Sequence, residues 1–154
     1  SRGLGDVYKR QAIRHYEKII ERLEHKENLD PLFLQSAYAF LAHIYSEEGN
    51  EKALDNLMQK FGQVFQGNAK DLKPLVRVKP VYPRTLKSGF VVYEFTIDEY
   101  GRVQNPKVVV SEGGKKFEKA SLKALNKWRY RPQMVNGKRV PTKGVQTQFT
   151  FERG

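Results

Sequence analysis

The sequence predicts an α+β protein in which a β-β-α-β module, a small antiparallel sheet covered by one helix, follows an all-α helical hairpin. Apolar residues recur at helical spacing in the first half and alternate with polar residues in two segments of the second half. Residues 1–75 carry 11 Lys or Arg and 11 Asp or Glu, so the whole net charge of +11 belongs to residues 76–154. This asymmetry indicates a domain boundary and favours acidic partners for the second half.

Residues 1–11 stand apart from the rest of the sequence. The chain does not begin with methionine, and Asp6–Gln11 back-translates readily to a transposon end sequence used in preparing sequencing libraries. We therefore expect translated adapter without ordered structure up to about Gln11, and a parent protein with an upstream membrane anchor or signal peptide. The sequence has no run of roughly 18 uninterrupted apolar residues, the length that a membrane helix needs.

Residues 12–66 are predicted to form helices. Asp30 and Pro31 are typical of a helix start, and Gly49-Asn50 predicts a break between the second and third helices. The predicted apolar faces comprise Ala12, Ile13, Tyr16, Ile19, Ile20 and Leu23, then Leu34, Ala37, Tyr38, Leu41, Ala42, Ile44 and Tyr45, and finally Ala53, Leu54, Leu57, Met58 and Phe61.

This helical segment resembles tetratricopeptide repeats. Leu41-Ala42, Tyr45, Gly49 and Ala53 follow the order of that family, and Leu29-Asp30-Pro31 resembles its turn between repeats. The interval from Gly49 to Ala53 is one residue shorter than usual, and about one and a half repeats are present. A generic helical hairpin remains the alternative. Either structure predicts a role in protein contact or spacing.

Residues 67–75 are predicted to form a linker, because Gly67-Asn68 and Pro74 interrupt the helical pattern. A strand is then predicted from Gly89, followed by a turn at Asp98–Gly101 and a second strand from Arg102 to Ser111. The first strand places these residues on its apolar face: Val91, Tyr93, Phe95 and Ile97.

A helix and a last strand complete the predicted module. Phe117, Ala120, Ser121, Ala124, Leu125 and Trp128 share one helix face, while Lys115, Lys116, Lys119, Lys123 and Lys127 face solvent. Asn136-Gly137 predicts a turn. In the last strand Val145, Thr147, Phe149 and Phe151 alternate with Gln146, Gln148, Thr150 and Glu152.

About half of the chain, roughly Val76–Gly154, resembles the C-terminal domain of the TonB energy-transducer family. The matching residues occur in the family's order: Tyr82-Pro83, Gly89, Val91, Phe95–Asp98, Gly101–Val103, Asn105, Ser111, Phe117, Ala124-Leu125, Trp128–Tyr130, Pro132, Gly137, Phe149 and Phe151. Two features depart from the pattern. The segment between Pro83 and Gly89 is shorter than usual, and Val81 stands where some members carry a polar residue.

The resemblance implies a function in peptide binding. Family members bind the TonB box of an outer-membrane receptor by adding it as a strand beside their own last strand, here Lys143–Glu152. The uncharged outward row of that strand leaves its edge open to pairing. The implied binding residues are Val81, Tyr82 and Pro83 beside the groove, and Lys143, Gly144, Val145, Gln146, Thr147, Gln148, Phe149, Thr150 and Phe151 along the edge.

The resemblance also implies a cellular setting, the periplasm of a Gram-negative bacterium. There an ExbB/ExbD-type inner-membrane motor would drive active transport, such as siderophore or iron uptake, through an anchor upstream. An anchorless periplasmic scaffold is the rival hypothesis, and a basic nucleic-acid-binding domain is a third. The open edge of the last strand also permits a homodimer formed by strand exchange.

Other kinds of site are disfavoured. The sequence has no recognisable nucleophile motif, so we expect no enzyme and no cofactor. His15, His25 and His43 lack partners at metal-ligand spacing. Trp128 and Tyr130 are predicted to pack in the core rather than to bind a ligand. The lysines spread over the solvent face of their helix, which favours a solvated surface or a general attraction to acidic partners over nucleic acid.

Overall fold

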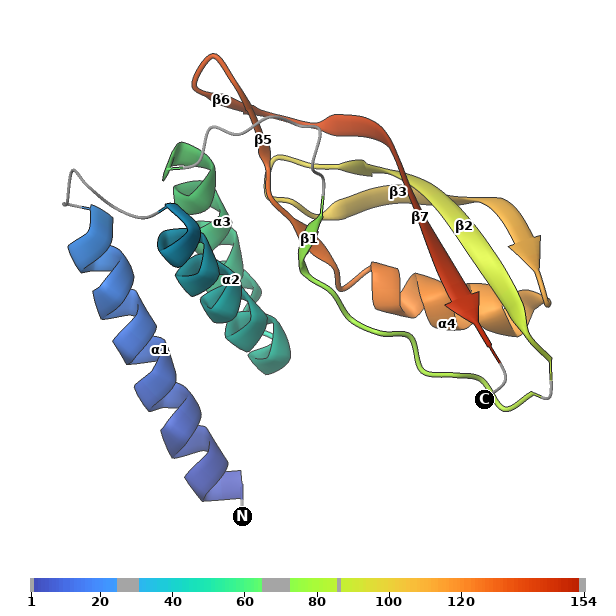
Figure 1. Ribbon diagram of the computed structural model, residues 1–154, viewed down its shortest axis with the longest axis horizontal. Coiled ribbons are helices and arrows are strands. Elements are labelled where there is room, and N and C mark those ends of the chain that lie inside the picture. The colour runs from blue at the N-terminus through green and yellow to red at the C-terminus, as the bar shows by residue number, and fades with distance from the viewer. Residues whose placement is uncertain (1, 25–30, 65–72, 86, 153–154) are drawn as a thin grey trace. The chain divides into compact units, whose positions relative to one another are not determined.

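The computed structural model describes residues 2–24, 31–64, 73–85 and 87–152 (Figure 1). The chain divides into two compact units, Ser1–Leu57 and Met58–Gly154, with the division inside the third helix. The predicted linker at 67–75 lies mostly outside the described residues, so the boundary predicted there stays a prediction. Mixed helix and sheet in two units confirm the predicted α+β class.

The described ranges 2–24 and 31–64 contain three helices: α1 (Arg2–Glu24), α2 (Pro31–Glu48) and α3 (Glu51–Val64). Helix α1 begins at Arg2 and therefore runs through residues for which the sequence predicted no ordered structure. Asp30 and the side chains of Leu23 and Pro31 lie outside the described residues. The tetratricopeptide resemblance and the adapter origin of the first residues stay predictions.

The helices bury the faces that their spacing predicts. On α1, Ile20 is buried, and Ala12, Ile13, Tyr16 and Ile19 are half-buried. All seven apolar residues predicted for α2 are buried. The break at Gly49-Asn50 is confirmed, because α2 ends at Glu48 and the Asn50 carboxamide accepts a hydrogen bond from the Ala53 amide, which caps α3.

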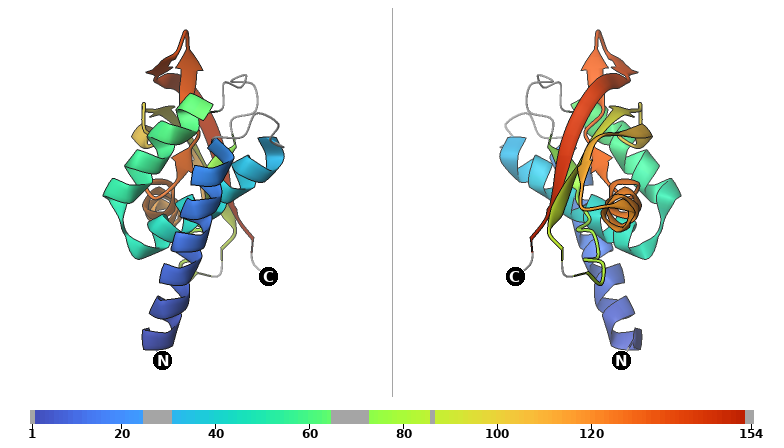
Figure 2. Two further views of the ribbon diagram at one scale, coloured as in Figure 1. Left: turned by 90° about the vertical axis from the view of Figure 1, so that its left-hand side faces the viewer. Right: turned by 90° about the vertical axis from the view of Figure 1, so that its right-hand side faces the viewer.

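Seven strands and one helix follow within residues 73–85 and 87–152. The strands are β1 (Pro74–Val76), β2 (Gly89–Ile97), β3 (Val103–Glu112), β4 (Arg129–Tyr130), β5 (Gln133–Val135), β6 (Lys138–Val140) and β7 (Thr142–Phe151), and helix α4 (Lys115–Leu125) follows β3. The main sheet is antiparallel in the order β3-β2-β7, with α4 on one face (Figure 2). The pairs β1-β4 and β5-β6 form two smaller sheets.

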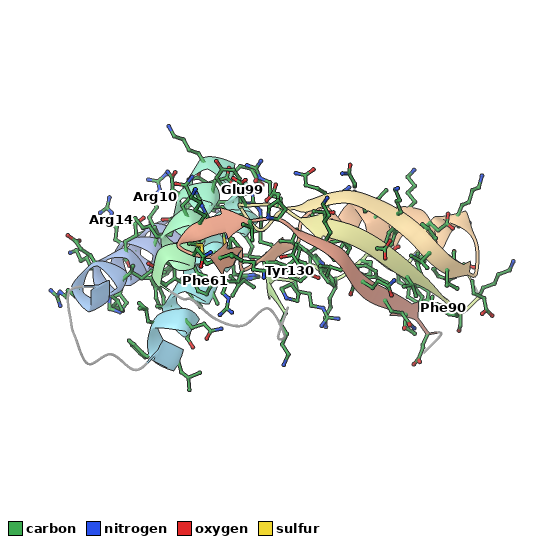
Figure 3. All side chains as sticks on the ribbon, turned by 90° about the horizontal axis from the view of Figure 1, so that it is seen from above. Arg10, Arg14, Phe61, Phe90, Glu99 and Tyr130 are labelled. Atoms are coloured by element: carbon green, nitrogen blue, oxygen red, sulfur yellow. The ribbon has the colours of Figure 1, made fainter. Side chains whose placement is uncertain are left out.

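The core of this unit lies between the main sheet and α4. Val91, Tyr93, Phe95 and Ile97 project from β2 into it, as their alternation predicts. The other core members are Phe117, Ala124, Leu125, Trp128, Tyr130, Phe149 and Phe151. Figure 3 shows side chains on both faces of the sheet, with Phe90 near the start of β2 and Tyr130 in β4. Burial on one face only explains why the β2 pattern alternates so strictly.

Two details correct the sequence-based prediction. Trp128 does not lie on the helix, because α4 ends at Leu125 and the next residues close tighter turns, with the Trp128 amide donating to the Leu125 carbonyl at 3.0 Å. Its predicted place in the core is confirmed. The short strands β1, β4, β5 and β6 were not predicted, since two or three residues are too few to show alternation.

A membrane-spanning helix needs a long apolar stretch, and α1 to α4 contain none within the ranges that the structure describes.

Candidate functional site: the free edge of β7

β7 lies at one edge of the main sheet. It pairs with β2 from Val145 to Phe151 in continuous antiparallel register, and no other described strand pairs with it. Lys143 and Gly144 form a bulge opposite Thr96, with Gly144 in the left-handed region at φ 71°. The regular part of the predicted edge is therefore Val145–Phe151, roughly 20 Å long at strand rise.

The two faces of β7 differ in what they offer a partner. Phe149 and Phe151 are 5% and 2% exposed and belong to the core, so they contribute only backbone atoms at the edge. Gln146, Gln148 and Thr150 lie exposed on the opposite face. The Gln146 amide donates to the Glu94 carboxylate at 3.3 Å, and the Gln148 amide donates to the Thr150 hydroxyl at 3.2 Å. Val145 and Thr147 are half-buried.

The segment around Tyr82 lies beside the end of β7. The Tyr82 ring meets Phe151 edge-on with centroids 5.7 Å apart, and meets Phe117 in the same way at 6.1 Å. Its hydroxyl donates to the Lys87 carbonyl at 3.0 Å. Val81 is 81% exposed, so the residue that departs from the family pattern is available to a partner. The structure thus brings the Val81–Pro83 group and the end of the β7 edge together.

Trp128 fixes the other end of this segment. Its indole nitrogen donates to the Val78 carbonyl at 2.8 Å, and its ring lies 5.0 Å from Phe149. A buried indole N–H requires an acceptor, and the sequence predicts that requirement without naming the carbonyl. Val78 and Lys87 were missed as structural determinants of the site, because they act through backbone oxygens that carry no sequence signal.

The central strand is held to α4 by a polar contact inside the core. The Tyr93 hydroxyl donates to the Glu118 carbonyl at 2.7 Å and lies 3.0 Å from the Ser121 hydroxyl. Burial raises the pKa of Tyr93, with the Glu118 charge adding to the effect and the Ser121 hydrogen bond opposing it. The neutral phenol therefore links β2 to the helix, and it fixes the strand that β7 pairs with.

The opposite edge, β3, is irregular. Its register with β2 shifts twice: Val109 is an extra residue between the partners of Val92 and Tyr93, and Asn105-Pro106 lie opposite the single residue Phe95. Asn105 has a φ of 52°, in the left-handed region. Pro106 has no amide hydrogen, and Lys107 is exposed. Bulges, proline and lysine are the features that discourage strand pairing, so the sheet has one blunted edge and one regular edge.

Comparison with known families identifies the domain. Residues 78–152 match the family described as Gram-negative bacterial TonB protein C-terminal. Residues 78–152 of the chain belong to the TonB C-terminal family. This confirms the resemblance inferred from the sequence motifs, and the match includes the Tyr82 segment, the main sheet and α4.

Three TonB proteins or domains show the extent of the similarity. The curated Protein TonB from Pseudomonas aeruginosa is 34% identical over 86 residues, which are 53% of this chain and 25% of that protein. The solution structure of the Pseudomonas aeruginosa TonB C-terminal domain has a TM-score of 0.47 and 33% identity over 56% of this chain and 90% of that chain. The TonB2 protein from Vibrio anguillarum has a TM-score of 0.43 and 36% identity over 57% and 87%. The chain thus spans about a quarter of the length of the curated relative that it matches.

Proposed function

We propose that the β7 edge binds an extended segment of a partner by strand addition, and that this segment is the TonB box of an outer-membrane receptor. The observation that carries the proposal is the free, regular and uncharged edge of Val145–Phe151. Main-chain hydrogen bonds to such an edge supply affinity with little dependence on sequence, and flanking side chains supply selectivity. Val81, Tyr82 and Pro83 flank the partner strand in this proposal, whereas Lys143 and Gly144 lie at the bulge where pairing ends.

The family match of residues 78–152 supports a proposal about the wider role. We propose that the parent protein works in the periplasm of a Gram-negative bacterium, where an ExbB/ExbD-type motor supplies proton-motive-force-derived energy for active transport, including siderophore or iron uptake. The domain would transmit force as a binding module and would catalyse no reaction. This role is tested by grafting residues 76–154 onto a working TonB protein in place of its own C-terminal domain. Restored siderophore-dependent growth supports the role, and failure with a folded, receptor-binding graft counts against it.

Strand addition is tested by nuclear magnetic resonance on the isotope-labelled chain with a TonB-box peptide. Amide shifts are expected along Val145–Phe151 and around Tyr82, with few along Val103–Glu112. A peptide with N-methyl groups on alternate amides is the matched control, because it keeps the side chains and loses the donors. Absence of shifts in β7 at millimolar peptide would reject the proposal. Shifts that depend on protein concentration without peptide would indicate a homodimer formed by strand exchange instead.

A protein-interaction scaffold is the second candidate. The helical unit favours it, because Leu32 and Phe33 at the start of α2 are 71% and 55% exposed. Large apolar side chains so exposed suit a protein contact. If the graft fails in transport while Leu32→Ser abolishes capture of a periplasmic protein, the scaffold explains the chain better than the transducer.

A further inference from the structure

The outer face of α4 carries a row of lysines that folding alone does not explain. Lys115, Lys119 and Lys123 are spaced four residues apart and are all exposed. They therefore follow one side of the helix for roughly 12 Å. Lys116 lies in the first turn and Lys127 in the turn that follows the helix, and both are also exposed. Glu118 is the only acidic residue in the helix, and it is half-buried.

This arrangement works against the stability of the helix. Like charges four residues apart repel each other across one turn. Lys115 and Lys116 lie at the N-terminal end, where the helix dipole favours negative charge, whereas Lys123 lies in the last turn, where the dipole favours positive charge. No side chain caps this end, because the residue before the helix is Gly114. A row of like charges that stabilises the helix little and buries nothing is better explained by binding than by structure.

The chemistry of the face points to a broad anionic surface. The row contains no arginine, so it lacks the planar fork that binds single carboxylates or phosphates in a bidentate manner. The aromatic residue of the helix, Phe117, is fully buried, so the face offers no stacking platform for nucleic acid bases. Leu122, 36% exposed, is the apolar residue on this outer side. Lysine point charges around a partly exposed leucine match the headgroup region of an anionic bilayer.

We infer that the outer face of α4, formed by Lys115, Lys116, Lys119, Lys123 and Lys127 with Leu122, binds the surface of a membrane that contains anionic phospholipid. The face lies on the side of α4 away from the sheet, so the β7 edge stays available to a peptide while the helix lies on the bilayer. Membrane attachment here would concentrate the domain near a charged leaflet, in addition to whatever the β7 edge binds.

The test uses the full chain and flotation with lipid vesicles. Phosphatidylcholine vesicles with phosphatidylglycerol as roughly a third of the lipid should bind the chain, and phosphatidylcholine alone should not. The triple variant K115Q/K119Q/K123Q should weaken binding on the order of 100-fold, at about five-fold per lysine near the surface. The matched control K79Q/K107Q/K138Q removes the same charge from exposed positions off the helix, and should weaken binding less than about five-fold. Added salt should release the chain.

Two further measurements keep the inference falsifiable. The melting temperature of the K115Q/K119Q/K123Q variant should equal or exceed that of the parent chain, and the conservative K119R variant should bind vesicles as the parent does. Equal losses in both triple variants would assign the effect to net charge and overturn the inference. Binding of a DNA duplex through the same lysines, with no binding to anionic vesicles, would overturn it in favour of nucleic acid.

Discussion

The two edges of the main sheet, β7 and β3, have similar lengths but opposite characters. β7 pairs regularly from Val145 to Phe151, and two buried phenylalanines anchor it. β3 contains two bulges. It also carries Pro106 and Lys107, and its valines at 108 to 110 are exposed. The contrast teaches that edge position alone does not create a binding site. A strand can accept a partner strand when its buried side chains pack against the core and keep its backbone regular.

The largest expected effect tests how firmly each edge is anchored. Phe149→Ala should lower the free energy of unfolding by about 3–5 kcal/mol, because it empties a buried site beside Trp128 and Tyr93. Val108→Ala on β3 should cost less than about 1 kcal/mol, since that side chain is 44% exposed. Urea denaturation of both variants measures the difference. Equal costs would show that β3 is anchored as firmly as β7.

The next effect concerns two of the glycines with positive φ, Gly101 before β3 and Gly144 within β7. Gly101, at φ 79°, has no room for a Cβ, which would lie 1.9 Å from the Tyr130 carbonyl oxygen. Gly101→Ala should cost about 2–4 kcal/mol from strain and displacement of β4. Gly144, at φ 71° in the β7 bulge, has nothing within 4 Å, so Gly144→Ala should cost about 1–2 kcal/mol from backbone strain alone. Thermal unfolding should rank the two in this order, and the reverse ranking would contradict the geometry.

The sequence predicts the β7 side of this comparison better than the β3 side. Alternation from Val145 to Phe151 predicts a strand with one buried face, because burial acts on every second residue. On β3 the residues around Val109 read as a continuous apolar run, and the bulge there depends on the pairing with β2. The contacts of Val78 and Lys87 run through carbonyl groups, which every residue has. Sequence patterns therefore cannot predict those contacts, which only the structure shows.

A smaller effect is expected at the segment beside β7. Tyr82→Phe removes the hydroxyl that donates to the Lys87 carbonyl, and keeps the ring against Phe117 and Phe151. The cost in stability should be about 0.5–1 kcal/mol, at the low end because the residue is 40% exposed. Peptide affinity should fall in the same variant if this segment flanks a partner strand on the β7 edge. Titration calorimetry measures the affinity, and an unchanged value would remove the Tyr82 hydroxyl from the binding site.

The smallest effect on stability is expected on β3. The same change tests whether Pro106 and Lys107 prevent this edge from pairing with another strand. In the double variant Pro106→Thr/Lys107→Thr, the strand regains an amide donor and loses a charge. The free energy of unfolding should change by no more than about 0.5 kcal/mol, because Lys107 is exposed and Pro106 is only half-buried on an edge strand. The new edge should nevertheless pair with a second copy, which sedimentation velocity detects as a dimer that grows with concentration.

The matched control for the β3 double variant is Gln146→Thr/Gln148→Thr on β7, which changes two side chains without altering the backbone donors. This control should sediment like the parent chain. If the β3 double variant does so as well, the bulges at Asn105 and Val109 suffice to block pairing, because they displace the backbone groups that a partner strand must reach. Proline and lysine would then be secondary, and the regular geometry of Val145–Phe151 would be the single property that separates the proposed binding edge, β7, from β3.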